Sequence, residues 1–339
     1  MRRFGYGNLI LAALIYTALS FQLYHIHFQS FDRWEWLLPV NVSLAALGCY
    51  LLSRRWVSSF VGSVFAGAVY GFGPFMLSLA RFHPTAGLLV ASIPWLFCPA
   101  AFGRNTKWRF AAGVSVSVPF ILVIVFFQLS THYGLFAVST QARLRTDDLL
   151  SLLTPLVVAE HDAIGTNIIG FYHVPIAALL MGSAMLLAAR RLHILVLMGT
   201  GIALSCWRPF FAVSPVIWLA IPALCCSVLI GAGIQGIISA GPADAKWLLA
   251  GSLIQTGFAI AALMLAARYF QVFLSLADEY ARLFVRTGEM YILGAIAMMI
   301  LFFLARARLR MAVVRTAVLC SALAVDIYLS ATFIVDRLV

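Results

Sequence analysis

Carboxylate and imidazole side chains gather in the segments between the apolar stretches of this chain. The segment 25–36 carries Asp32 and Glu35 beside two histidines, and the segment 130–172 carries further acidic residues and histidines. A carboxylate beside an imidazole can act as a general base or ligate a divalent cation. No pair among them has the spacing of a known catalytic or metal-binding motif. Ordinary solvation of loop residues therefore remains the alternative to a reactive site.

The apolar stretches themselves offer little chemistry. Ionisable residues at membrane depth are the usual mark of pumps and ion-coupled carriers. Here we expect nearly all of them at helix ends or in loops, with Asn41, Gln235 and Gln255 as the deepest polar residues. The sequence therefore gives little support to a proton pump or an ion channel. A haem inside the bundle is also disfavoured, because it needs histidines at membrane depth.

The composition predicts that lipid is the solvent of these stretches. Of the 339 residues, 63% are hydrophobic and 10% are charged, whereas about 25% are charged in an ordinary soluble domain. Eleven stretches approach the length of about 20 residues with which a helix crosses a bilayer. We predict an all-α, polytopic transmembrane helix bundle that forms one multi-pass domain over residues 1–339. The stretches are 8–24, 37–53, 57–75, 86–102, 110–129, 173–189, 193–207, 214–236, 248–267, 289–305 and 316–334.

The distribution of Lys and Arg predicts the orientation of the bundle. With a cytoplasmic N-terminus, most of the 23 basic residues fall in inside loops. Eleven crossings then place the C-terminus on the extracytoplasmic side, together with most histidines and acidic residues. The formal charge of +11 is accounted for by this bias, so the sequence indicates no nucleic-acid partner.

Several short segments, taken in order, carry a resemblance to a known family. They are Asn41–Arg55, Ala66–His83 with Tyr-Gly-Phe-Gly-Pro-Phe at 70–75, Ile93–Leu96, Ser139–Arg143, Leu152–Pro155 and Gly170–Pro175. Over about residues 35–205 the chain resembles the GT-C superfamily of membrane glycosyltransferases, and its YfhO-like bacterial branch in particular. The resemblance implies a GT-C-like fold in the bacterial cytoplasmic (inner) membrane. It also implies transfer of a sugar from a polyprenyl-phosphate carrier on the extracytoplasmic face.

The resemblance further implies roles for individual residues. The catalytic carboxylate of GT-C enzymes lies in the first outer loop, where this chain has Asp32 and, less favourably, Glu35. Arg81 and Arg143 would bind the phosphate of the carrier, because a guanidinium offers paired donors to phosphate oxygens. The only cofactor that the sequence indicates is a divalent metal ion. Its expected ligands are His83 and His132.

The first outer loop favours an alternative within the same fold. It has about a dozen residues, too few for the two amphipathic helices that the resemblance implies there. The alternative is a shortened, non-catalytic relative that serves as an accessory or scaffold subunit. Its partners would be membrane lipids and other membrane subunits. A small-molecule carrier is a third hypothesis, because helices interrupted by Pro and Gly can line a cavity.

Overall fold

The computed structural model describes residues 6–31, 34–82, 84–101, 106–132, 153–156, 171–190, 192–207, 213–272, 278–306 and 312–338. Every regular element in these ranges is a helix, so the prediction of an all-α chain is confirmed. Helices suit a chain dissolved in lipid, because each one satisfies its own backbone hydrogen bonds.

Each of the eleven predicted stretches overlaps one or more helices, although the stretch 57–75 is interrupted by the break between two of them. The helices are α1 (Tyr6–Tyr24), η1 (His25–His27), α2 (Leu37–Ser53), α3 (Phe60–Gly71), α4 (Pro74–Phe82), α5 (Pro84–Phe97), η2 (Cys98–Ala101) and α6 (Thr106–His132). They continue with α8 (His173–Ala188), α9 (Leu192–Cys206), η5 (Pro215–Leu219), α10 (Ala220–Ser239), η6 (Pro242–Asp244), α11 (Ala245–Val272), α12 (Asp278–Arg306) and α13 (Ala312–Leu338).

Among the described residues, seven helical segments are long and apolar enough to cross a membrane, by length and composition. They include Tyr6–His27, Phe110–His132 and Val313–Asp336. Four other apolar helices, α2, α5, α8 and α9, are shorter. The chain is thus a helical membrane protein, whereas the count of eleven crossings and the orientation stay predictions.

Small residues allow the central helices to approach closely. A Cβ added to Gly62 of α3 would lie 2.6 Å from the carbonyl oxygen of Gly231 of α10. One added to Gly182 of α8 would lie 2.0 Å from the carbonyl oxygen of Leu229, also of α10. Such contacts are typical of membrane helices, where dispersion forces replace the hydrophobic drive to associate. They fix α3, α8 and α10 as the centre of the bundle.

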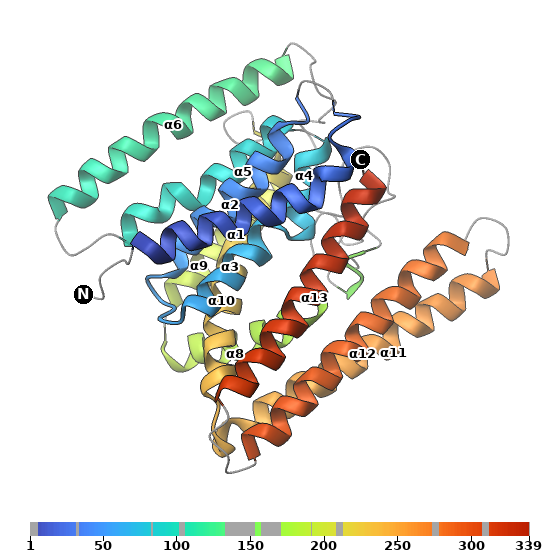
Figure 1. Cartoon of the computed structure of the whole chain (residues 1–339). Coiled ribbons are helices and arrows are strands. Elements are labelled where there is room, and N and C mark those ends of the chain that lie inside the picture. Colours follow the sequence, from blue (N-terminus) through green and yellow to red (C-terminus); the bar gives the residue numbers. More distant parts are fainter. Residues whose placement is uncertain are drawn as a thin grey trace.

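The peripheral helices lie on two sides of this centre. Figure 1 shows α6 along one side and the hairpin of α11 and α12 along the other, next to α13. In α6, only 6% of the most apolar part of the span is buried in the described structure. Most of its surface is therefore left for lipid or for another protein.

The break between α3 and α4 creates a polar anchor point. Gly73 fits there because a Cβ would lie 2.3 Å from the carbonyl oxygen of Val69. Helix termini leave backbone carbonyls without an intrahelical partner. The hydroxyl of Tyr172, just before α8, donates to the carbonyl of Phe72 over 2.6 Å. The start of α8 is thereby fixed against the break.

Two of the three predicted deep polar residues are fully buried. Asn41 donates from Nδ2 to the carbonyl of Pro84 over 2.8 Å, and Gln255 lies in the α8–α11–α12 region described below. Gln235 is only partly buried and accepts from the backbone N–H groups of Ser58 and Ser59. It therefore binds the backbone just before the start of α3.

Candidate functional site

A cluster of buried polar side chains in the described structure is built around Asp326, which lies near the middle of the span Val313–Asp336. Its side chain is fully buried. The expectation that ionisable residues keep to helix ends is therefore wrong at this position. The signal was present in the sequence, since Asp326 interrupts the apolar run of α13.

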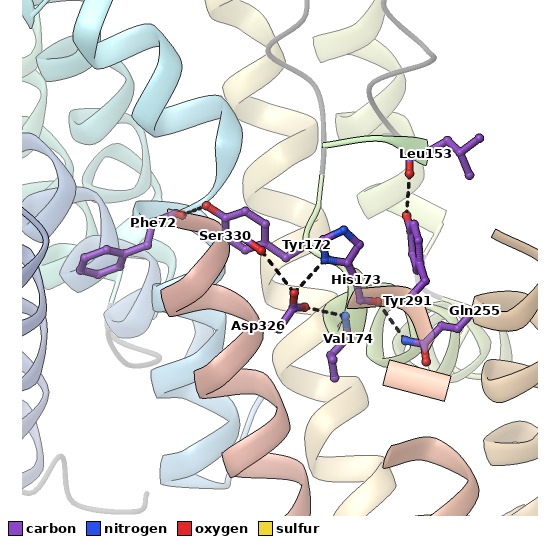
Figure 2. Close-up of polar contacts among 9 residues, drawn as sticks. All are labelled: Phe72, Leu153, Tyr172, His173, Val174, Gln255, Tyr291, Asp326 and Ser330. Carbon is purple, nitrogen blue, oxygen red and sulfur yellow. Dashed lines mark hydrogen bonds and ion pairs between the residues drawn. The ribbon is translucent and has the colours of Figure 1, made fainter. Parts of the chain in front are cut away.

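Asp326 forms a buried pair with His173 at the start of α8 (Figure 2). His173 Nδ1 lies 2.8 Å from Asp326 Oδ1, and neither side chain has any exposed surface. The backbone N–H of Val174 donates to Oδ2 over 2.7 Å. Ser330, one turn further along α13, donates to Oδ1 over 3.4 Å. The carboxylate thus accepts up to three hydrogen bonds, as a buried acidic group requires.

Two further helices enclose the pair. Gln255 of α11 donates from Nε2 to the carbonyl of His173 over 2.9 Å. The ring of Tyr291 of α12 meets the imidazole edge to face, with 4.6 Å between the ring centroids. The Tyr291 hydroxyl then donates to the carbonyl of Leu153 over 3.0 Å. Side chains from α8, α11, α12 and α13 therefore meet at one point, as Figure 2 shows.

Three buried polar atoms in this region have no hydrogen-bond partner among the described residues. They are His173 Nε2, Gln255 Oε1 and Thr287 Oγ1, the last one turn before Tyr291 on α12. Unpaired polar atoms are uncommon in protein interiors and call for an explanation. The cluster therefore has the capacity to bind a proton or a small polar group.

A second polar contact joins the ends of α1 and α13. His27 Nε2, just after α1, lies 3.1 Å from Asp336 Oδ1. The two side chains are 18% and 51% exposed, and Figure 1 shows the end of α1 close to the C-terminal end of α13. This pair could not be predicted from the sequence, because its members are 309 residues apart.

Next to this contact, an apolar groove of about 190 Å³ lies between α1, α3 and α13. Its floor includes the buried residues Tyr16 and Phe72, and its rim includes Tyr328, which is 39% exposed. The groove extends to Leu23 and Ala331. These lie about one helical turn before His27 and Asp336. The groove therefore ends close to the polar contact. Its full lining is Ile15, Tyr16, Leu19, Leu23, Val64, Phe65, Ala68, Phe72, Ala324, Ile327, Tyr328 and Ala331.

The described residues between α1 and α2, in the predicted first outer loop, pack through aromatic side chains. The rings of Phe28 and Trp36 are stacked with 5.0 Å between centroids, and Phe31 packs edge to face against both. Amphipathic aromatic rings are typical of the boundary between membrane and water. Glu35 is partly buried in the turn before α2, where its carbonyl accepts from the N–H of Leu38. The cluster thus lies next in sequence to Glu35, one of the two candidate carboxylates.

The other predicted site residues are placed only in part. Asp32, His83 and Arg143 lie outside the described residues. Arg81 belongs to the last turn of α4, a helix that packs against α13, and its side chain is not described. His132 ends α6 and is exposed. The catalytic, phosphate-binding and metal-binding roles therefore stay predictions.

Metal binding at the described residues has no further support. Within the ranges given above, no group of three or more His, Cys, Asp and Glu side chains is arranged to hold a metal ion. The His173–Asp326 pair and the His27–Asp336 contact each provide two such side chains. Compared with models of known families, with curated proteins and with solved structures, the chain gives no match.

Proposed function

We propose that this membrane protein transfers a sugar from a polyprenyl-phosphate carrier, on the extracytoplasmic face of the bacterial inner membrane and within a GT-C-like architecture. The observation that supports the proposal is the apolar groove between α1, α3 and α13, which ends close to the first outer loop. A lipid-linked donor needs such a combination, because its tail stays in hydrocarbon while its phosphate and sugar meet water.

The groove has the chemistry that an isoprenoid chain requires. All twelve lining residues are apolar or aromatic, and an apolar cavity of about 150 Å³ stays dry and binds hydrocarbon. The exposed rim at Leu19 and Tyr328 opens the groove sideways, toward the acyl chains of the bilayer. A branched chain could therefore enter from the membrane without crossing water.

The residues at the outer end then have distinct tasks. Asp32 or Glu35 would remove the proton from the hydroxyl of the acceptor as that oxygen attacks the anomeric carbon of the donor sugar. The bond from that carbon to the phosphate oxygen breaks, and the carrier phosphate leaves. Arg81 and Arg143 would stabilise the leaving phosphate. A divalent ion at His83 and His132 would add positive charge beside it.

Binding of undecaprenyl phosphate to the full chain in lipid nanodiscs tests the proposal. Ala324 is an exposed residue of α13 that lines the groove, so Ala324→Trp should fill the groove without disturbing the core. We expect at least a tenfold loss of affinity. Ala111→Trp, on the exposed surface of α6, is the matched control and should bind like the wild type. Equal binding by both variants would refute the proposal.

A second candidate, the accessory or scaffold subunit, is favoured by the exposed surface of α6. Among the described helices, α6 packs mainly against α5, and interfaces between membrane helices form by such lateral packing. Purification in mild detergent would then yield a partner in constant ratio to the chain. Asp32→Asn and Glu35→Gln separate the two candidates, because they should abolish sugar transfer but leave a scaffold unaffected.

A further inference from the structure

The His173–Asp326 pair has a chemistry that sugar transfer does not use. It lies near the middle of a membrane span and is completely buried. Ionisable residues at this depth are rare, and they commonly mark proton or ion pathways. We propose that His173 and Asp326 form an intramembrane proton-binding site, in which His173 Nε2 takes up and releases one proton.

The hydrogen bonds of the pair identify the atom that exchanges the proton. His173 Nδ1 and both carboxylate oxygens of Asp326 are engaged, over 2.8 Å between the side chains and 2.7 Å from the Val174 N–H. His173 Nε2 is buried and has no partner among the described residues. Figure 2 shows it on the side of the imidazole that is turned away from Asp326. Nε2 is therefore the atom of the pair that is available to a proton.

Charge balance supplies the driving force for proton uptake. With a proton on Nδ1 only and Asp326 ionised, the pair carries one net negative charge. A proton from water, added at Nε2, forms an imidazolium and brings the net charge to zero. An uncompensated charge in hydrocarbon is costly, whereas a neutral ion pair with satisfied hydrogen bonds is tolerated. Uptake thus makes the pair neutral as a whole.

The net charge in this region is set mainly by His173 and Asp326 themselves. Tyr172 precedes His173 and is close enough to Tyr24 of α1 to interact with it electrostatically, and Tyr291 faces the imidazole from α12. From α11, the neutral Gln255 faces the pair. On α12, Thr287 and Tyr291 are buried. The charged residues of α12 closest in sequence to these two are Arg282, Arg286 and Glu289, which are exposed, and the guanidinium of Arg286 lies over the Phe333 ring of α13.

The position of the pair links its protonation to the groove. Ile327 and Tyr328 follow Asp326 directly and line the groove on α13. Asp326 and Ser330 hold the adjacent side of the same helix against α8. A proton at His173 therefore changes the electrostatic attraction that fixes one wall of the groove. The proton site itself does not depend on what the groove binds.

Solid-state NMR of the full chain in nanodiscs tests the site. His173 is the only histidine followed by valine, so histidine labelled uniformly with ¹³C and ¹⁵N, combined with ¹⁵N valine, assigns its carbonyl and, through the side-chain carbons, its ring nitrogens without any substitution. The ¹⁵N shift of Nε2 is then followed over the pH range in which the wild type stays folded. We expect Nε2 to be protonated at the acidic end and deprotonated at the alkaline end, reversibly. A nitrogen that stays in one state throughout would overturn the proposal.

Two matched variants separate a proton site from a merely structural contact. In Asp326→Asn, the anion that stabilises the imidazolium is gone, so we expect Nε2 of His173 to stay unprotonated over the same range. Asp336→Asn removes the carboxylate beside another histidine, His27, and should leave the His173 titration unchanged. An unchanged titration in Asp326→Asn would contradict the proposal. If that variant does not fold, the wild-type titration alone decides.

Discussion

Replacing Asp326 with alanine removes the acceptor of three hydrogen bonds from the centre of the helix bundle. The Nδ1–H of His173 and the N–H of Val174 then lie buried without an acceptor, whereas the Ser330 hydroxyl can rotate to another one. Each unsatisfied buried donor costs about 1–3 kcal/mol, so two of them cost about 2–6 kcal/mol. Breaking a buried pair by removing one partner costs about 3–5 kcal/mol in other proteins. We expect Asp326→Ala to lower the free energy of unfolding by about 3–5 kcal/mol.

Reversible unfolding by dodecyl sulfate in mixed micelles, followed by tryptophan fluorescence, measures this loss, since the chain contains eight tryptophans. The matched control is Asp336→Ala, which removes a carboxylate paired with His27 at an exposed position. Exposed pairs contribute about 0–1 kcal/mol. Comparison of the single variants His173→Ala and Asp326→Ala with the double variant His173→Ala/Asp326→Ala should give a coupling energy of about 0.5–3 kcal/mol. A loss below about 1 kcal/mol for Asp326→Ala would refute the reasoning.

Three further predictions concern single contacts and the topology. Tyr291→Phe should lower the free energy of unfolding by about 0.5–1.5 kcal/mol in the same assay, because it removes the hydrogen bond to the partly buried carbonyl of Leu153. Gly182→Ala should destabilise by at least about 1–3 kcal/mol, since its Cβ would meet backbone 2.0 Å away. Gly199→Ala has open space and should be neutral or stabilising by up to about 1 kcal/mol. Cysteines at 104 and 140 should react with an impermeant reagent from opposite sides of the membrane, and labelling from one side would overturn the predicted topology.

The helices could be predicted from the sequence because lipid imposes a simple rule. A stretch with almost no charge must form a helix in the membrane, where its backbone has no other hydrogen-bond partners. The predicted stretches 37–53 and 173–189 coincide almost residue for residue with α2 and α8. The polar anchor at Phe72 depends on a contact with Tyr172, and no local pattern reports such a contact.

The buried pair was harder to predict. Asp326 stands alone in an apolar stretch, which was a visible signal, but its partner His173 is 153 residues away at a helix end. Hydropathy gives the length of a span and not the neighbour that each residue of the span meets. The groove could not be predicted from the sequence for the same reason, because α1 and α13 come from opposite ends of the chain. Long-range packing decides both features.

The occupant of the groove is the most direct test of the proposed function. It can be seen in a cryo-electron microscopy map of the full chain in nanodiscs that contain undecaprenyl phosphate. Our account predicts continuous density for a branched chain between α1, α3 and α13, with the phosphate at the end near His27 and Asp336. A groove that holds only ordinary acyl chains, or a carrier bound elsewhere on the protein, would contradict it.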